Sequence, residues 1–190
     1  MKTRKGAQST ARPAVSRVAP QGKAVFLVGF MGAGKTTVGK ALSRRLSCPF
    51  EDLDDRIQNR EGKTIEQLFQ SGEPTFRKAE TTALRVLLRE LRTSTRVVAL
   101  GGGTFVHAGN ASLIERAGVH SVFLDAPVEE LFRRCEQEQK VRPLRQTAGQ
   151  FRQLYDARRG SYMKAAFRIE TNGKDVNTVA AEVACKLGLG

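Results

Sequence analysis

The sequence is poor in the residues that build disulfide frameworks and metal sites. It contains no tryptophan, two histidines and only three cysteines among its 190 residues. Cys48, Cys135 and Cys185 are odd in number and far apart, without the close spacing of zinc knuckles or redox motifs. We therefore expect free thiols, with neither a disulfide framework nor a zinc site.

Long apolar runs are also missing. No stretch approaches the roughly 18 to 20 apolar residues that a membrane span needs, and the first residues lack the apolar middle of a secretory signal. We therefore expect a cytoplasmic protein without a membrane partner. The length and the 40% hydrophobic content are those of one domain with one core.

Acidic residues are absent from residues 1–22. That segment has almost no large apolar residue either, so it cannot bury enough surface to offset the entropy of ordering. We expect a disordered basic tail over 1–22 and a single domain over 23–190. An arginine-rich start without acids is also typical of organelle transit peptides, which leaves import as a minor alternative. The basic residues of the tail are Lys2, Arg4, Lys5, Arg12 and Arg17.

The formal net charge of +13 raises the question of a nucleic-acid partner. Five of these charges belong to the tail, and the rest of the chain shows no basic patch interleaved with aromatic residues. Substrates that carry phosphates and a carboxylate explain the remaining charge better. We expect no nucleic-acid partner, and we expect a monomer.

Short apolar runs alternate with longer amphipathic stretches from residue 22 onward. This alternation is typical of a parallel sheet covered by helices on both faces, the α/β class. The pattern predicts five strands and seven helical stretches, the second of them in two pieces broken near Gly62. We expect strands at 24–29, 49–53, 96–101, 120–126 and 167–171, and helices at 35–47, 55–71, 75–92, 110–117, 127–138, 147–164 and 176–187.

A phosphate-binding motif follows the first predicted strand. Gly29, Gly34, Lys35 and Thr36 occupy the four specified positions of G-x-x-x-x-G-K-S/T, between an apolar strand and an amphipathic helix. Backbone N–H groups of such a loop surround the β-phosphate, and the helix N-terminus adds a positive dipole end. Lys35 would reach the β- and γ-phosphates, and the Thr36 hydroxyl would hold Mg²⁺. The motif predicts nucleotide binding.

Two carboxylates end the second predicted strand. If the chain is extended through 50–54, alternation sends Asp52 and Asp54 to the same side. One carboxylate can then hold a water of Mg²⁺ while the other accepts a hydrogen bond from a substrate hydroxyl. A solvated acidic turn that caps the next helix is the alternative reading.

Two further motifs indicate where an acceptor binds. Arg77 and Glu80 stand three residues apart on one helical face, where they can pair while the guanidinium faces a carboxylate. Alone, this spacing is no more than a common surface ion pair. The third predicted strand ends in Gly101, Gly102 and Gly103, at the sheet edge where backbone can approach a ligand.

The P-loop, the Asp-x-Asp pair, Phe-Arg-x-x-Glu and the triple glycine together resemble the shikimate kinase family, over roughly residues 23–187. The resemblance implies the nucleoside monophosphate kinase-like fold, a three-layer α/β/α P-loop architecture with a five-stranded parallel sheet in the order 2-3-1-4-5. It also implies transfer of the γ-phosphoryl group of MgATP to the 3-hydroxyl of shikimate, a step towards chorismate and the aromatic amino acids.

The resemblance also assigns roles to residues. The implied catalytic residues are Lys35, Asp54 and Arg142, and the implied metal residues are Thr36 and, through water, Asp52. Shikimate would contact Asp54, Arg77, Gly102, Gly103 and Arg158, with Glu80 holding Arg77. The implied ATP contacts are Gly32, Ala33, Gly34, Lys35, Thr36, Thr37, Arg134, Arg142 and Lys174.

Two stretches in the last third of the chain complete the resemblance. Val141-Arg142-Pro143-Leu144 is similar to the lid motif of the family, which places a lid near 134–148. The stretch from Arg158 to Tyr162 matches Arg-x-Pro-x-Tyr, except that Gly160 stands where proline is usual. This departure leaves Arg159 as the alternative to Arg158.

Two other functions remain as alternatives. Another small-metabolite kinase, such as a gluconate kinase, would share the P-loop but would not need both arginines directed at a carboxylate. A non-catalytic nucleotide-dependent regulator would keep the fold, although the presence of Lys35, Asp52, Asp54 and Arg142 argues against it.

Overall fold

The protein was analysed as a computed structural model that describes residues 24–91, 95–137 and 147–189. The expected basic tail over 1–22 lies outside the described residues. So do Arg142 and the rest of the predicted lid motif.

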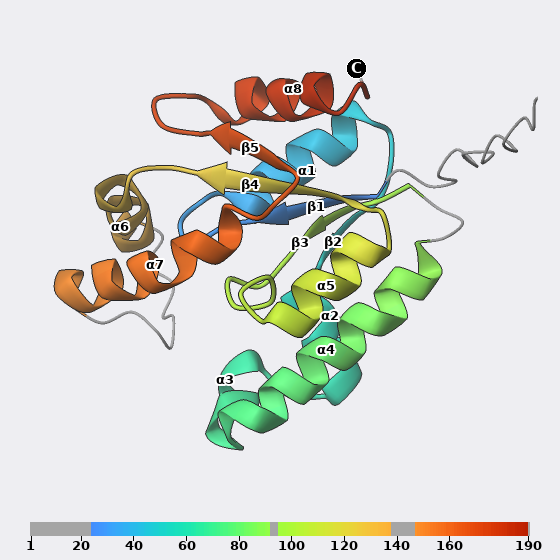
Figure 1. Ribbon diagram of the computed structural model, residues 1–190, viewed down its shortest axis with the longest axis vertical. Helices are drawn as coiled ribbons and strands as arrows, with labels where there is room; N and C mark the ends of the chain where they lie inside the picture. The colour runs from blue at the N-terminus through green and yellow to red at the C-terminus, as the bar shows by residue number, and fades with distance from the viewer. Residues whose placement is uncertain (1–23, 92–94, 138–146, 190) are drawn as a thin grey trace, which may run out of the picture.

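A five-stranded parallel sheet forms the centre of the molecule (Figure 1). Its order is β2-β3-β1-β4-β5, which confirms the order implied by the family resemblance. In the register, Val25 of β1 lies between Val97 of β3 and His120 of β4. The strands are β1 (Val25–Val28), β2 (Phe50–Asp52), β3 (Val97–Ala99), β4 (His120–Asp125) and β5 (Phe167–Glu170).

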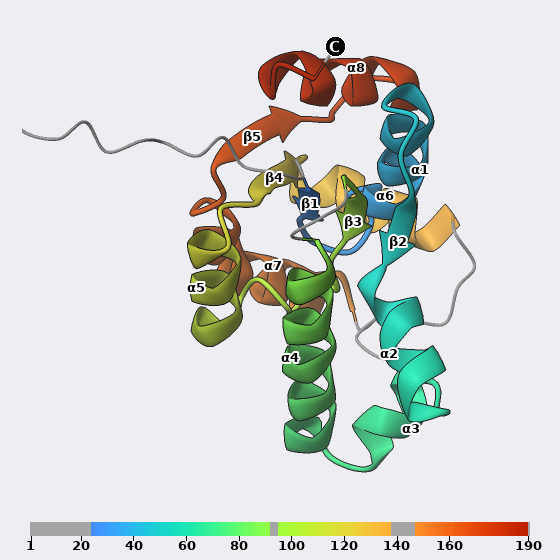
Figure 2. The same cartoon turned by 90° about the vertical axis from the view of Figure 1, so that its right-hand side faces the viewer.

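Helices cover both faces of the sheet, as the α/β pattern predicts (Figure 2). Helices α1 and α8 lie together on one face, and α4, α5 and α7 lie on the other. Each predicted strand and helix is present, with boundaries within two residues of the expected ones. The helices are α1 (Lys35–Arg45), α2 (Leu53–Glu61), α3 (Ile65–Gln70), α4 (Glu73–Glu90), α5 (Ala108–Arg116), α6 (Val128–Gln137), α7 (Ala148–Tyr162) and α8 (Val176–Lys186).

Local sequence signals explain several of these boundaries. Gly62, with a φ of 64°, ends α2 in the left-handed conformation that glycine adopts at low cost, which accounts for the predicted break. Capping boxes begin two helices: Thr64 with Gln67 at α3, and Thr147 with Gln150 at α7. The four residues of β1 are fully buried, as expected for the central strand of a covered parallel sheet.

The order of the sheet brings the predicted functional segments to one edge. The P-loop follows β1, Asp52 ends β2, and the glycine triplet follows β3. Because β2, β3 and β1 are parallel neighbours, these three segments meet at the carboxyl edge of the sheet, where open α/β sheets bind ligands. In the described part of the chain, helices long and apolar enough to cross a membrane are absent.

Candidate active site

The P-loop runs from the end of β1 into the first turn of α1. Gly32 has a φ of 78°, and a Cβ atom there would lie 2.5 Å from the carbonyl oxygen of Leu131 in α6, so conformation and space both require glycine. Gly34 caps α1 without a side-chain hydrogen bond among the described residues, which leaves the first helical N–H groups available to a phosphate. Ala33 is buried in the loop, and Thr37 is exposed in the first turn of α1.

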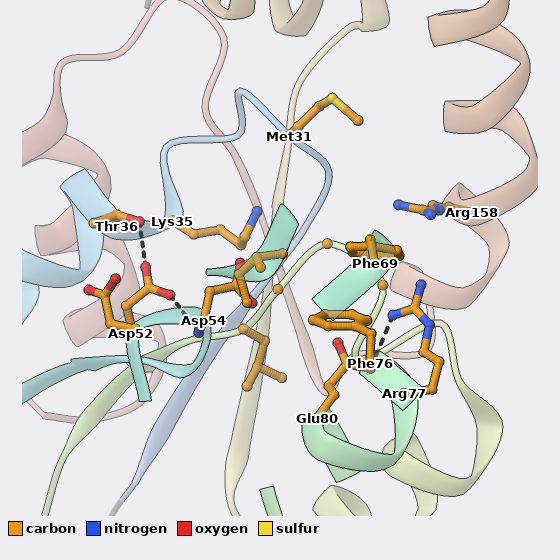
Figure 3. A pocket seen from close by; sticks show the side chains of 16 residues that line it. Met31, Lys35, Thr36, Asp52, Asp54, Phe69, Phe76, Arg77, Glu80 and Arg158 are labelled. Atoms are coloured by element: carbon orange, nitrogen blue, oxygen red, sulfur yellow. Dashed lines mark hydrogen bonds and ion pairs between the residues drawn. The ribbon is translucent and has the colours of Figure 1, made fainter. Parts of the chain in front are cut away.

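Lys35 and Thr36 extend from that first turn (Figure 3). The Lys35 ammonium donates to the backbone carbonyls of Gly29 and Phe30 at 2.9 and 3.0 Å, which keeps it over the loop. The Thr36 hydroxyl donates to Asp52 Oδ2 at 2.9 Å. An alcohol and a carboxylate oxygen so close to the loop suit Mg²⁺, which prefers oxygen ligands and keeps several waters beside one or two protein groups and the substrate phosphates.

The relation between Asp52 and Asp54 differs from the sequence-based expectation. Strand β2 ends at Asp52, which is the N-cap of α2, and its Oδ1 accepts a hydrogen bond from the Asp54 N–H at 3.1 Å. The chain is therefore not extended through Asp54, and the strand-alternation argument was wrong. Both carboxylates nevertheless line one cavity, because the first turn of α2 brings Asp54 back towards it.

Asp54 is electrostatically unusual. Its Oδ1 is buried, and no hydrogen-bond donor in the described part of the chain reaches that atom. Burial, followed by the nearby charge of Asp52, raises the pKa of Asp54 to about 6, while Lys35 opposes the shift. A Cβ atom at Gly101 would lie 2.6 Å from the same oxygen, so the first residue of the glycine triplet leaves room for this carboxylate.

Arg77 and Glu80 form the pair that their spacing predicts. Arg77 Nη1 donates to Glu80 Oε2 at 3.1 Å, and Glu80 is buried. The other oxygen of Glu80 accepts a hydrogen bond from Thr104 Oγ1 at 2.7 Å, and Glu73 accepts two from the far side of the guanidinium. Both partners were missed from the sequence, although Glu73 stands four residues before Arg77 and Thr104 directly follows the glycines.

Two cationic side chains lie beside the glycine triplet, and the absence of a side chain at Gly103 makes room for one of them, Arg77. A Cβ atom at Gly103 would lie 2.5 Å from Arg77 Nη1, and one at Gly102 would lie 3.8 Å from Arg158 Nη1. The Tyr162 hydroxyl donates to the Gly102 carbonyl. Burial raises the pKa of Tyr162 to about 12, so this donor keeps its proton. Tyr162 was noted from the sequence as the end of the Arg-x-Pro-x-Tyr stretch but was assigned no role.

These groups surround one cavity of about 340 Å³. Figure 3 shows Thr36, Asp52 and Lys35 on one side of it, and Arg77 and Arg158 on the other. Phe69 and Phe76 stack at 4.3 Å between ring centroids and form an apolar wall. The remaining lining residues are Met31, Asp54, Asp55, Ile65, Glu80, Leu100, Gly101, Gly102 and Gly103.

Comparison with known proteins agrees with this geometry. The family model described as shikimate kinase matches residues 31–187. The chain belongs to the shikimate kinase family. A shikimate kinase of Geobacter sulfurreducens is 42% identical over 171 residues, which cover 88% of this chain and 92% of the relative. Another, from Cereibacter sphaeroides, is 38% identical over 184 residues, covering 95% and 88%.

Solved structures agree in both sequence and fold. The shikimate kinase from Acinetobacter baumannii, in complex with shikimate, superposes with a TM-score of 0.79 at 33% identity and covers 89% of this chain and 95% of that one. A gluconokinase from Sinorhizobium meliloti has a TM-score of 0.61 at 13% identity, with coverage of 90% and 94%, and this likeness shows the shared fold alone.

The departure from the family motif at Gly160 does not interrupt the structure. Helix α7 runs continuously from Ala148 through Gly160 to Tyr162. Within it, Arg158 lines the cavity, whereas Arg159 turns away and donates to Asp125. Of the two arginines that the sequence left as alternatives, Arg158 is therefore the one on the side of the cavity.

The two residues expected near adenine lie outside the cavity that contains Asp54, Arg77 and Arg158. Neither Arg134 nor Lys174 lines the large cavity. Arg134 Nη2 donates to the Thr171 carbonyl at 3.2 Å, which links α6 to the loop after β5. Lys174, in that loop, pairs with Glu182 of α8 at 2.8 Å. Arg134 therefore contacts the same loop, residues 171–174, in which Lys174 lies.

Proposed function

We propose that the chain transfers the γ-phosphoryl group of MgATP to the 3-hydroxyl of shikimate, which yields shikimate 3-phosphate and ADP on the route to chorismate and the aromatic amino acids. The observation that carries the proposal is the two-sided cavity. Lys35 and Thr36 of the P-loop face it from one side, Arg77 and Arg158 from the other, and the Asp54 carboxylate lies between them in the view of Figure 3.

The P-loop side would bind ATP. The N–H groups of Gly32, Ala33 and Gly34 and the start of α1, with Thr37, would surround the phosphates, and Lys35 would leave its carbonyl partners for the γ-phosphoryl oxygens. Thr36 and, through water, Asp52 would hold Mg²⁺, which neutralises phosphate charge when bound. Arg142, outside the described residues, would close over the phosphates as part of a lid near 134–148. Arg134 and Lys174 would border the adenine.

Asp54 would meet the attacking hydroxyl. Its Oδ1 lacks a donor in the described structure, so a substrate hydroxyl would satisfy a buried acceptor that is otherwise costly. A pKa of about 6 leaves the group ionised at neutral pH yet basic enough to take the proton as the new P–O bond forms. We propose orientation of the hydroxyl as its first role and acceptance of the proton as its second.

Arg77 and Arg158 would clamp the substrate carboxylate. A planar guanidinium can donate two parallel hydrogen bonds to a carboxylate, and Glu80 and Glu73 already hold Arg77 in one orientation. Gly102 and Gly103 would let the ring of the substrate approach the backbone. The clamp lies away from the P-loop, so the transferred group and the recognised carboxylate are separated across the cavity.

The proposal also covers the oligomeric state, the compartment and the role of the N-terminal segment. We propose that residues 23–190 work as one monomeric cytoplasmic domain without a nucleic-acid partner, and that residues 1–22 take no part in catalysis.

Steady-state turnover with several acceptors tests the assignment. Formation of ADP, followed by a coupled assay, should be fast with shikimate and MgATP and near background with gluconate. The Lys35→Ala variant is the control for contaminating kinases. Faster turnover of gluconate than of shikimate would contradict the proposal, and so would ADP formation that does not depend on any acceptor.

A further inference from the structure

A polar cluster lies beside α7, outside the substrate cavity. Its centre is Asp125, a buried carboxylate at the end of β4. Arg159 Nη2 donates to Asp125 Oδ2 at 3.0 Å, and Arg159 Nε donates to the Tyr155 hydroxyl at 3.0 Å. The Tyr155 hydroxyl donates in turn towards Asp125 Oδ1 at 3.3 Å. Two residues one turn apart on α7 are thus tied to one carboxylate of the sheet.

The position of Arg159 in the chain gives this cluster a consequence for the substrate site. Arg159 directly follows Arg158, and neighbouring residues on an α-helix point about 100° apart. Anchoring one side chain therefore restricts rotation of the helix about its axis. The surface of a helix lies about 5 to 6 Å from its axis, so a rotation of about 10° would move the Arg158 guanidinium by about 1 Å. Misplacement of that size can cost a large part of catalytic efficiency.

The anchor lies beside a residue of α7 that has no side chain. Gly160 follows Arg159, and a Cβ atom there would have no neighbour within 4 Å, so this position contributes no side-chain packing. Glycine is also the most flexible residue in a helix interior. The neighbours of Gly160 hold the turn: Arg159 bonds to Asp125, and Tyr162 bonds to the Gly102 carbonyl and stacks on Phe123.

We infer that Arg159 is a positioning residue for the reaction: by fastening α7 to Asp125 it sets the orientation in which Arg158 meets the substrate carboxylate. The inference rests on the proposed role of Arg158 in the clamp. Arg159 itself does not line the cavity, so its effect would pass through its neighbour.

The chain offers a matched control for this inference. Arg168 also binds Asp125, with Nε 2.8 Å and Nη2 2.7 Å from Oδ2, but it belongs to β5 and not to α7. Loss of either arginine leaves Asp125 with the other one and with Tyr155. Both variants therefore disturb the same buried carboxylate, but only the change at Arg159 removes a contact between Asp125 and the helix that carries Arg158, which leaves Tyr155 as the remaining contact from α7.

The test compares Arg159→Gln with Arg168→Gln in the full chain. We expect Arg159→Gln to raise the KM for shikimate about fivefold or more, with the KM for ATP within about twofold. Arg168→Gln should leave both KM values within about twofold. The two variants should lower the melting temperature by similar amounts, because both remove one arginine from Asp125. Equal effects of the two changes on the KM for shikimate, or no effect of Arg159→Gln, would overturn the inference. If Arg159→Gln does not fold, Arg159→Lys keeps the charge and should raise the KM for shikimate about twofold; an unchanged value there would equally overturn it.

A double variant separates this inference from the proposed function. If Arg159 acts through Arg158, adding Arg159→Gln to Arg158→Lys should change the KM for shikimate by less than about twofold. A further fivefold rise in the KM for shikimate when Arg159→Gln is added to Arg158→Lys would overturn the positioning role of Arg159. The proposed role of Arg158 in the clamp would be unaffected by that result. A silent Arg158→Lys variant would instead remove the clamp, and the inference with it.

Discussion

The phosphate cradle and the acceptor wall are assembled in opposite ways. The cradle comes from one stretch, residues 29–36, and Lys35 contacts carbonyls only five and six residues away. The acceptor wall takes Asp54 from α2, Arg77 from α4, Gly102 from the loop after β3 and Arg158 from α7. The first and last of these residues, Asp54 and Arg158, are more than one hundred positions apart in the chain.

This difference predicts different responses to mutation. A cradle made of local backbone keeps its shape when one side chain is removed, so a change there should affect chemistry with little effect on structure. The acceptor wall depends on contacts between elements: Thr104 bonds to the Glu80 carboxylate, and Tyr162 bonds to the Gly102 backbone carbonyl. Changes there should affect substrate binding, pH dependence and stability together.

The largest effect is expected in the cradle. Lys35→Ala should lower kcat by about a thousandfold, because it removes the charge that follows the migrating phosphoryl group, while ATP should still bind to the backbone N–H groups. Steady-state kinetics and nucleotide titration check this. Lys40→Ala, an exposed change on the same helix, is the control and should be silent. Wild-type turnover by Lys35→Ala would remove the P-loop from the mechanism.

Asp54→Asn should separate activity from stability. We expect kcat to fall about a hundredfold, because the variant loses a proton acceptor in the site. We also expect the free energy of unfolding to rise by on the order of 1 to 3 kcal/mol at pH 7.5, because Asp54, with its pKa raised to about 6, is ionised there at a cost to the fold.

The sign of the pH dependence follows from the same shift. The stability that protonated Asp54 contributes is fully present below its unfolded pKa of about 3.9 and is lost as the pH rises through about 6. The difference between Asp54→Asn and the unchanged chain should therefore be greatest above pH 7 and shrink towards pH 4. Chemical denaturation with EDTA and without nucleotide measures it. Asp55→Asn, in the same turn but exposed, should show no such trend.

The clamp should respond to geometry as well as to charge. Arg77→Lys and Arg158→Lys should each lower kcat/KM for shikimate about tenfold or more, because lysine cannot donate two parallel hydrogen bonds to a carboxylate. The affinity for ATP without shikimate should stay within about threefold. Arg85→Lys, exposed on α4 with Arg77, is the control. If both clamp variants instead weakened ATP binding and left kcat/KM for shikimate unchanged, the two sides of the cavity would be wrongly assigned.

The smallest expected effect is a change in stability at two helical glycines. Gly160 is in α7, which carries Arg158 of the acceptor wall, and Gly39 is in α1, which follows the phosphate cradle. Gly160→Ala in α7 should stabilise the fold by about 0.5 to 1 kcal/mol, because the added Cβ meets open space and alanine favours a helix interior. Gly39→Ala in α1 should destabilise it, because its Cβ would lie 2.4 Å from the Phe50 ring. Thermal unfolding distinguishes the signs, and stabilisation by both changes would show that α1 packs less tightly on the sheet than described.

The correct predictions came from patterns among residues that are close together in the sequence. The strands and helices follow from hydrophobic periodicity and cap residues, so their boundaries were predicted within two residues. The P-loop is specified by a few glycines, Lys35 and Thr36 in one stretch. The pairing of Arg77 with Glu80 follows from their spacing on a helix. The sheet order came from the family resemblance and was confirmed.

Asp52 and Asp54 show where that kind of reasoning failed. Alternation predicted a shared side, but the strand ends at Asp52, two residues earlier than the argument needs, and Asp52 caps the next helix. The sequence could not decide between an extended segment and a cap, because Asp is common in both an N-cap and the end of a strand beside a ligand. The two carboxylates meet through the helical turn.

The sequence by itself therefore determined the α/β class, the phosphate cradle and the kind of side chain available for an acceptor. Only the tertiary structure decided that Thr104 supports Glu80, that Tyr162 holds Gly102, and that Arg158 faces the cavity while Arg159 faces Asp125. The physical reason is distance along the chain. Contacts within one turn or one helix follow from backbone geometry, whereas contacts across 24, 60 or 34 positions depend on how whole elements pack.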